Sequence, residues 1–302
     1  MRASTAFRGV YPILYAFFGA DGRLDRAAMR RQVEACIRGG AHGIAALGLA
    51  TEVNKLTDAE KRQVIDWLAE DVAGRLPLAV TISGSSVGQQ VDLVRAAERA
   101  GAAWVILQPP PVRGLPEAEY VRFFGAVMER TTLPVAIQNA PEYIGIGLSP
   151  AGLLTLAKAH ANFTLLKGEA SAVQIRRVIE ETEGRLAVFN GRAGLELPDV
   201  LRAGCAGMIP APECFDVQVR IAESMWTGRA EDEAEAERLY REILPLIVFV
   251  MQSVETFLCY GKRVTAQRLG LGEVHDRTPA LPPTAFGLAC AARYADRLGP
   301  FA

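Results

Sequence analysis

Short apolar runs alternate with amphipathic segments along most of the chain. The apolar runs lie at residues 9–17, 43–48, 76–83, 104–108, 134–139, 163–167, 186–190 and 206–210. Between them, apolar side chains recur three or four positions apart, which is typical of amphipathic helices. Such helices are predicted at residues 25–38, 58–72, 87–100, 117–130, 150–159 and 217–226. One more begins at residue 171, and a short one after the seventh apolar run ends at residue 203. The pattern therefore predicts eight strands, each followed by a helix.

Two of these helices carry signals for their first residues. Asp25 can cap the first helix, and Thr57 with Glu60 three residues later has the spacing of a capping box. The strands show no strong alternation of apolar and polar residues, which favours a parallel sheet covered on both faces. Eight consecutive units favour a closed (β/α)₈ barrel over an open doubly wound sheet.

The rest of the chain is also helical in pattern. A charged start leads into the apolar residues 243–254, and further helices are predicted near 262–269 and 284–298, joined by a proline-rich connector at 278–283. We predict an α/β fold in which residues 1–228 form a TIM barrel. Residues 229–302 are predicted to form a C-terminal helical appendage packed on that barrel.

Composition narrows the class of protein. The chain has 302 residues, half of them hydrophobic, and a net charge of −1, so neither nucleic acid nor an acidic surface is expected as a partner. The N-terminus lacks the pattern of a signal peptide, and the apolar run 243–251 is too short to cross a membrane. Five cysteines without a C-x-x-C spacing predict reduced, buried thiols in a cytoplasmic protein.

The sequence gives no indication of a metal or a cofactor. No G-x-G-x-x-G follows the first strand, which argues against dinucleotide binding. The three histidines, His42, His160 and His275, are scattered, which argues against a zinc site. We expect a protein that needs neither.

The strongest chemical signal is a lysine at the end of the sixth apolar run. Because strand residues two apart share a face, Lys167 is expected to point the same way as Phe163, Leu165 and Glu169. An ammonium group there either pairs with a charge or loses its proton, and a neutral lysine can form a Schiff base with a carbonyl substrate. The alternative is a structural ion pair between Lys167 and Glu169.

The barrel context strengthens the catalytic interpretation. Active sites of such barrels lie at the carboxyl ends of the strands, and Lys167 is the only lysine at any of those ends. The residues predicted there are Gly48, Leu49, Ala50, Thr51 and Glu52 after the second strand, Gln108 after the fourth, Gln138 and Asn139 on the fifth, Asn190, Gly191 and Arg192 after the seventh, and Ile209 on the eighth.

Several of these positions leave alternatives open. The loop 48–52 can turn backbone N–H groups and the Thr51 hydroxyl towards an anion, or it is simply a tight turn. Gln138 and Asn139 need hydrogen-bond partners, which a substrate hydroxyl or the core would supply equally well. Arg192 would hold a distal carboxylate or form a surface salt bridge.

Taken together, these residues resemble the dihydrodipicolinate synthase / N-acetylneuraminate lyase superfamily of class I, Schiff-base aldolases and lyases. The resemblance covers almost the whole chain and includes Gly48-x-x-x-Glu52, Asn139-x-Pro141, Lys167 and Gly191. It implies that Lys167 forms an imine with a 2-oxo acid, that the loop 48–52 binds the carboxylate of that acid, and that the protein is a homo-oligomer, a tetramer or a dimer.

This chain departs from the usual family pattern at the proton relay. The catalytic tyrosine of strand five falls at Gln138, the tyrosine lent by a neighbouring subunit falls at Pro111, and the substrate-binding arginine falls at Tyr143. A closer resemblance is to the 2-keto-3-deoxy-L-arabonate dehydratase branch, which also has glutamine for the strand-five tyrosine and Lys-x-Glu on strand six. Asn139 replaces the acid of that branch.

The sequence thus predicts a Schiff-base lyase that dehydrates a 2-keto-3-deoxy sugar acid. Lys167, Glu169 and Gln138 are the predicted catalytic residues. Gly48, Leu49, Ala50, Thr51, Asn139, Asn190, Gly191 and Ile209 are the predicted substrate-binding residues. The alternatives are retro-aldol cleavage or 4-hydroxy-tetrahydrodipicolinate synthesis through the same imine, and a non-catalytic barrel that binds a ligand.

Overall fold

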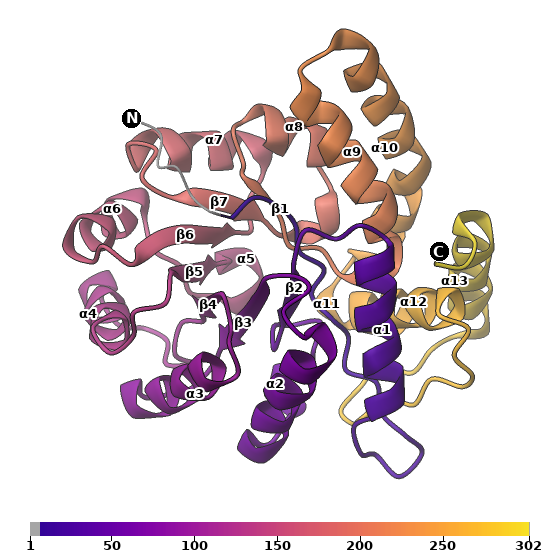
Figure 1. Cartoon of the computed structure of the whole chain (residues 1–302), viewed down its shortest axis with the longest axis horizontal. Helices are drawn as coiled ribbons and strands as arrows, with labels where there is room; N and C mark the ends of the chain where they lie inside the picture. Colours follow the sequence, from indigo (N-terminus) through magenta and orange to yellow (C-terminus); the bar gives the residue numbers. More distant parts are fainter. Residues whose placement is uncertain (1–6, 302) are drawn as a thin grey trace.

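Eight parallel strands form one sheet in the computed structural model, which describes residues 7–301. The strands are β1 (Gly9–Val10), β2 (Ile44–Ala46), β3 (Leu78–Ile82), β4 (Trp104–Leu107), β5 (Val135–Asn139), β6 (Phe163–Gly168), β7 (Ala187–Asn190) and β8 (Gly207–Met208). Their order is β1-β8-β7-β6-β5-β4-β3-β2, and every pair is parallel. Figure 1 shows the strands at the centre with helices around them, a TIM-barrel-like α/β fold as predicted.

The first strand is shorter than the predicted span 9–17. Pro12 has no N–H to donate to a neighbouring strand, which interrupts the regular ladder. The chain nevertheless continues along the sheet: Ile13 N–H donates to the Pro210 carbonyl at 2.7 Å, and Leu14 N–H donates to the Ala45 carbonyl at 3.0 Å. Residues 12–14 therefore bridge β8 and β2, the two strands on either side of the first.

The helices follow the predicted segments closely. They are α1 (Arg26–Arg38), α2 (Asp58–Val72), α3 (Val87–Arg99), α4 (Glu117–Met128), α5 (Pro141–Ile144), α6 (Pro150–Ala159), α7 (Ala172–Glu181), α8 (Leu197–Arg202), α9 (Phe215–Thr227), α10 (Ala230–Val250), α11 (Val254–Thr256), α12 (Lys262–Arg268) and α13 (Ala285–Leu298). The Asp25 cap and the Thr57–Glu60 capping box are confirmed. The short α5 and α11, three 3₁₀ turns and a π-helix at Phe257–Gly261 were not predicted.

Side chains at alternate positions along the strands belong to two different hydrophobic clusters. Val80 and Ile82 pack in the larger cluster with the helices, whereas Ala79 belongs to a second cluster with Tyr11, Trp104 and Phe189. In the second cluster the ring centroids of Tyr11 and Trp104 lie 5.6 Å apart, and those of Tyr11 and Phe189 lie 5.3 Å apart. This alternation is that of a barrel whose interior is filled by side chains, so a site must lie at its end.

The prediction that Phe163 points the same way as Leu165 and Lys167 is wrong, because β6 contains a bulge. Val135 of β5 pairs with Phe163, but the next residue, Ala136, pairs with Leu165, so Thr164 is an extra residue in β6. Phe163 consequently packs in the cluster with the helices, while Leu165 lies in the inner cluster. Beyond the bulge the alternation is regular, and Lys167 shares the inner face with Leu165.

The C-terminal helices continue from the last strand-helix unit. α10 packs on α9, and α12 packs on α13. Within residues 7–301 no single helix is long and apolar enough to cross a membrane, although the pair 230–250 and 254–268, bent by 110°, meets that test by length and composition alone. All five cysteines are buried and unpaired, as predicted.

Candidate active site

Lys167 lies one residue before the end of β6, between the two neighbouring strands. It is in register with Gln138 of β5 and Phe189 of β7. Its side chain is only 6 % exposed, and Glu169, two positions further on, is 7 % exposed. The N–H of Glu169 donates to the Asn139 carbonyl at 3.0 Å, so the extended backbone continues past Gly168 and keeps both side chains on one face.

A line of polar side chains crosses the ends of three strands. Lys167 Nζ lies 3.0 Å from Glu169 Oε1, and Gln138 Nε2 donates to the same oxygen at 2.6 Å. Gln108, which follows β4, donates its Nε2 to Gln138 Oε1 at 2.9 Å. Glu169 Oε1 therefore has two donors, and Gln138 links the carboxylate of Glu169 to the amide of Gln108. The sequence placed Gln108 at the end of the fourth strand but assigned it no role.

Lys167 and Glu169 lie in the wall of a small cavity of about 50 Å³. A larger hollow of about 730 Å³ lies next to it, over the ends of β3 and β4, and includes Gln108 in its wall. The two share Leu49, Tyr143 and Val254 as wall residues. A ligand with its carbonyl carbon at Lys167 therefore has room to extend past these three residues.

Not all of the predicted binding residues reach this cavity. Leu49, Ala50, Gly191 and Ile209 line it. Gly48, Thr51, Asn139 and Asn190 do not line it.

The side chains of Thr51, Asn139 and Asn190 bind backbone groups. The Thr51 hydroxyl, fully buried, donates to the Leu14 carbonyl at 2.7 Å and accepts from the Leu47 N–H at 2.9 Å. Asn139 makes two hydrogen bonds with the backbone of Leu148, and Asn190 donates to the Gly168 carbonyl at 3.0 Å. These amides and this hydroxyl hold the loops in place, so their side chains bind the backbone and do not line the cavity.

With this geometry established, comparisons with known proteins place the chain. The family model described as "Dihydrodipicolinate synthetase family" matches residues 6–285. The chain belongs to the dihydrodipicolinate synthetase family. Enzymes of this family are lyases, and their names cover several reactions.

Three relatives show that range within the dihydrodipicolinate synthetase family. The L-2-keto-3-deoxyarabonate dehydratase of Azospirillum brasilense is 31% identical over 251 residues, covering 80% of this chain and 78% of the relative. The 4-hydroxy-tetrahydrodipicolinate synthase of Methanoculleus marisnigri is 31% identical over 246 residues, covering 80% and 83%. YagE of Escherichia coli K12, provisionally named a 2-dehydro-3-deoxy-D-gluconate aldolase, is 28% identical over 249 residues, covering 82% of each. The structure of YagE in complex with pyruvate aligns with a TM-score of 0.86 over 97% of this chain and 99% of YagE, at 24% identity.

Arg192 forms a salt bridge and also lies in the cavity wall. It lines the small cavity, and its Nη1 also donates to Glu196 Oε2 at 2.8 Å. Burial opposes the charge, but the Tyr143 hydroxyl and the Glu196 carboxylate hold the pKa of the Arg192 guanidinium above its ordinary value. Arg192 and Ala193 both have left-handed backbones, with φ of 57° and 52°, and Gln218 donates to the Ala193 carbonyl at 2.8 Å.

The C-terminal region supplies wall residues that sequence reasoning missed. Met251, Ser253, Val254 and Phe257 line the small cavity. The only local signal was Ser253, which caps α11 in a capping box with Thr256 and so marks a break after α10. Nothing in the spacing of these residues indicates that they lie near Lys167, because the contact is made between distant parts of the chain.

A buried acid lies behind the cavity wall. Glu213 follows β8, two residues after the wall residue Ala211, and its Oε1 accepts a hydrogen bond from the Tyr15 hydroxyl at 3.1 Å. Its other carboxyl oxygen, Oε2, has no partner among the described residues. Burial raises the pKa of Glu213 to about 7, against the smaller lowering effect of the Tyr15 hydrogen bond. This carboxyl therefore changes charge near neutral pH.

Proposed function

We propose that the chain is a class I lyase that forms a Schiff base between Lys167 and a 2-oxo acid, and that it dehydrates a 2-keto-3-deoxy sugar acid. The observation that carries this proposal is the buried Lys167 amine in a cavity wall, 3.0 Å from the Glu169 carboxylate. A lysine in such a place is either a nucleophile or an expensive structural ion pair. The cavity beside it and the family of the chain favour the nucleophile.

The reaction follows from the positions of these two groups. Nζ of Lys167 attacks C2 of the 2-oxo acid, and loss of water gives a protonated imine. The imine withdraws electrons, so a base can take a proton from C3 and leave an enamine. Glu169 lies beside Nζ and is placed to be that base. The enamine then expels the C4 hydroxyl, which leaves as water with the proton that Glu169 returns. Hydrolysis of the imine frees the lysine.

The loop after β2 is suited to the carboxylate of the substrate. Within the described residues, the backbone N–H groups of Ala50 and Thr51 have no acceptor, and Ala50 lines the cavity with Lys167. Neighbouring free N–H groups in a tight turn form a site for an anion. We therefore assign carboxylate binding to these backbone groups, with Leu49 and Ile209 as apolar walls.

Dehydration is favoured over aldol cleavage by the residue on β5. Gln138, where tyrosine is usual, is bonded to both Gln108 and Glu169, which leaves Glu169 as the proton carrier nearest Lys167. The dehydratase among the relatives also supports this choice. A panel of 2-keto-3-deoxy acids separates the two reactions: dehydration releases water and no pyruvate, whereas retro-aldol cleavage releases pyruvate.

Borohydride trapping with pyruvate tests the Schiff base itself. The wild-type protein should gain the mass of one reduced pyruvate adduct, located on Lys167 by peptide mass spectrometry. The Lys167→Met variant should gain none, while Lys158→Met, which removes an exposed lysine paired with Glu183, should behave as the wild type does. A wild-type protein without any adduct would instead be a ligand-binding barrel without imine chemistry.

We also propose a homo-oligomer, in which residues 1–228 form the barrel and 229–302 the C-terminal appendage. Val112 and Leu115, between β4 and α4, are each 45% exposed and offer apolar surface. The apolar face at 243–250 is less available, because Ile243, Leu246 and Ile247 are buried within the chain. A monomer at micromolar concentration in sedimentation velocity would contradict the oligomer.

A further inference from the structure

The loop after β2 is held in a conformation that its residues do not favour by themselves. Leu47 and Glu52, at the two ends of the loop, both have left-handed backbones, with φ of 62° and 52°. Non-glycine residues adopt this conformation at a cost in free energy, because Cβ approaches the neighbouring carbonyl oxygen. Interactions with residues outside the loop must therefore hold both ends. Held in this way, the loop keeps the N–H groups of Ala50 and Thr51 without a backbone acceptor.

Barrel groups hold the first end. The buried Thr51 hydroxyl spans the loop between the Leu47 N–H and the Leu14 carbonyl. Leu14 belongs to the segment that joins the first strand to β2. This end is therefore fixed by residues of the first two strand units alone.

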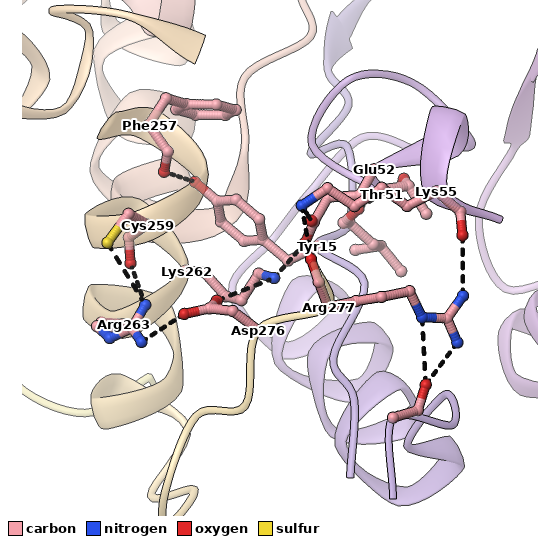
Figure 2. Close-up of polar contacts among 12 residues, drawn as sticks. Tyr15, Thr51, Glu52, Lys55, Phe257, Cys259, Lys262, Arg263, Asp276 and Arg277 are labelled. Carbon is pink, nitrogen blue, oxygen red and sulfur yellow. Dashed lines mark hydrogen bonds and ion pairs between the residues drawn. The ribbon is translucent and has the colours of Figure 1, made fainter. Parts of the chain in front are cut away.

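The second end is held from the C-terminal region, as Figure 2 shows. Glu52 Oε1 forms an ion pair with Nζ of Lys262 at the start of α12, and both side chains are 1% exposed. Glu52 Oε2 accepts from Nζ of Lys55 at 2.5 Å, and that lysine also donates to the Arg277 carbonyl at 3.0 Å. Both oxygens of the Glu52 carboxylate are thus bound, one of them by a residue 210 positions away.

Lys262 is itself held in place by its surroundings. Its Nζ lies 5.3 Å from the centre of the Phe18 ring and 3.8 Å from Asp276 Oδ1. Asp276 in turn accepts from Arg263 at 2.6 Å. A lysine this deeply buried needs its counter-ion, so the pair Glu52–Lys262 fixes the position of Glu52 relative to α12.

We infer that Lys262 is a positioning residue for the Schiff-base site, because its ion pair with Glu52 fixes the loop whose Ala50 and Thr51 N–H groups receive the substrate carboxylate. This inference rests on the proposed function. The start of α12 then affects substrate binding through the loop, without touching the substrate. Losing the pair should weaken binding of a carboxylate and leave the reactivity of Lys167 unchanged.

Lys262→Met tests this, because methionine keeps most of the apolar length of the side chain and removes the charge. Two carbonyl probes are trapped with borohydride: pyruvate, which has a carboxylate, and acetone, which has none. The pyruvate concentration that gives half-maximal trapping should rise tenfold or more, while the rate of trapping with acetone should stay within twofold of wild type. Lys158→Met, which loses an exposed ion pair, should change neither.

Two results would overturn the inference. Unchanged pyruvate trapping would show that the loop does not need Lys262. An equal loss with pyruvate and acetone would show that Lys262 supports the whole fold and not the loop. A wild-type protein that traps neither probe would refute the proposed function, which is a different outcome.

A second variant covers the case in which Lys262→Met does not fold. The double variant Glu52→Gln/Lys262→Met removes both fully buried charges, and Lys55, whose side chain is 17% exposed, keeps its hydrogen bond to the Arg277 carbonyl. It should fold, trap acetone as wild type does, and still need at least tenfold more pyruvate, since the amide has lost its anchor on α12. Trapping of pyruvate at wild-type concentrations by this variant would refute the positioning role.

Discussion

The side chain of Glu169 lies directly against Gly191, the first residue after β7. A Cβ atom at position 191 would be 2.5 Å from Cγ and 2.8 Å from Cδ of Glu169, closer than real side chains approach. Gly191 also donates its N–H to the Gly168 carbonyl at 3.3 Å, so its backbone has little freedom to retreat. The absence of a side chain at Gly191 therefore gives Glu169 the space to reach Lys167.

Gly191→Ala should displace Glu169 and impair proton transfer. Exchange of the pyruvate methyl protons in D₂O reports this step, because exchange requires the enamine. We expect the exchange rate, followed by NMR, to fall roughly tenfold or more, since small displacements of a reacting group have large effects on rate. The free energy of unfolding should fall by about 1–3 kcal/mol through overpacking.

Gly272→Ala is the matched control for that variant, because a Cβ at Gly272 meets no atom within 4 Å. Its exchange rate should equal that of wild type. Wild-type exchange in Gly191→Ala would show either that Glu169 moves without consequence or that it is not the proton carrier.

Glu169→Gln separates a base from a counter-ion. If Glu169 is the base, the variant should still give the borohydride-trapped adduct on Lys167, while methyl exchange falls by about 10²–10⁴-fold. If Glu169 only balances the charge of Lys167, the rate of imine formation should change and the exchange of the preformed imine should not. Near-normal exchange would end the proposal and would point to a water molecule near Gln138 as the base.

The elements of the fold were largely predictable because local signals determine them. The caps at Asp25 and Thr57 and the strand that ends in Lys167 follow from neighbouring residues, as does the side-by-side placement of Lys167 and Glu169. The bulge at Thr164 was not predictable, because an extra residue in a strand leaves the run of apolar residues unbroken.

The sequence also failed to predict the direction of side chains at the strand ends and the contacts between residues far apart in the chain. An amide at a strand end can turn into the cavity or towards a loop, and Asn139 turned to the Leu148 backbone. The sequence could not choose, since both partners satisfy the same hydrogen-bonding groups. The pair Glu52–Lys262 joins residues 210 positions apart, so nothing near either residue indicates the other.

Glu213 should make stability depend on pH between about 4.5 and 7. Its pKa is raised by burial to about 7, above that of the unfolded chain, so the folded state binds this proton more tightly. Stability is then complete below pH 4.5 and is lost as pH rises through 7. At about 1.4 kcal/mol for each of the roughly 2.5 pH units in that window, the full loss is about 3.5 kcal/mol.

Glu213→Gln removes that dependence and keeps an acceptor for Tyr15. Urea unfolding should show that the free energy of unfolding of the variant, relative to wild type, is about 2–3 kcal/mol higher at pH 8 than at pH 5. Glu60 is the control of opposite sign: its hydrogen bond from Arg277 lowers the pKa of Glu60 to about 2. Its stabilising effect is lost only as pH falls through that value, so Glu60→Gln should differ from wild type equally at pH 5 and pH 8. A constant gap for Glu213→Gln would contradict the raised pKa.

Arg192 should favour ligands that carry a second anionic group. It and Lys167 are the two cationic residues in the wall of the small cavity, and Tyr143 lies beside its guanidinium. Arginine binds carboxylates through paired N–H groups, and hydrogen bonds between charged groups contribute about 1.5–3 kcal/mol each. We therefore expect borohydride trapping to need roughly tenfold less 2-oxoglutarate than 2-oxopentanoate, its counterpart without the distal carboxylate. Arg192→Met should remove this preference and leave pyruvate trapping unchanged. Glu196→Gln, which removes the carboxylate charge that competes for Arg192, should keep or increase it. If wild type and Arg192→Met discriminate alike, Arg192 serves only its salt bridge with Glu196, and the distal end of the substrate is recognised elsewhere.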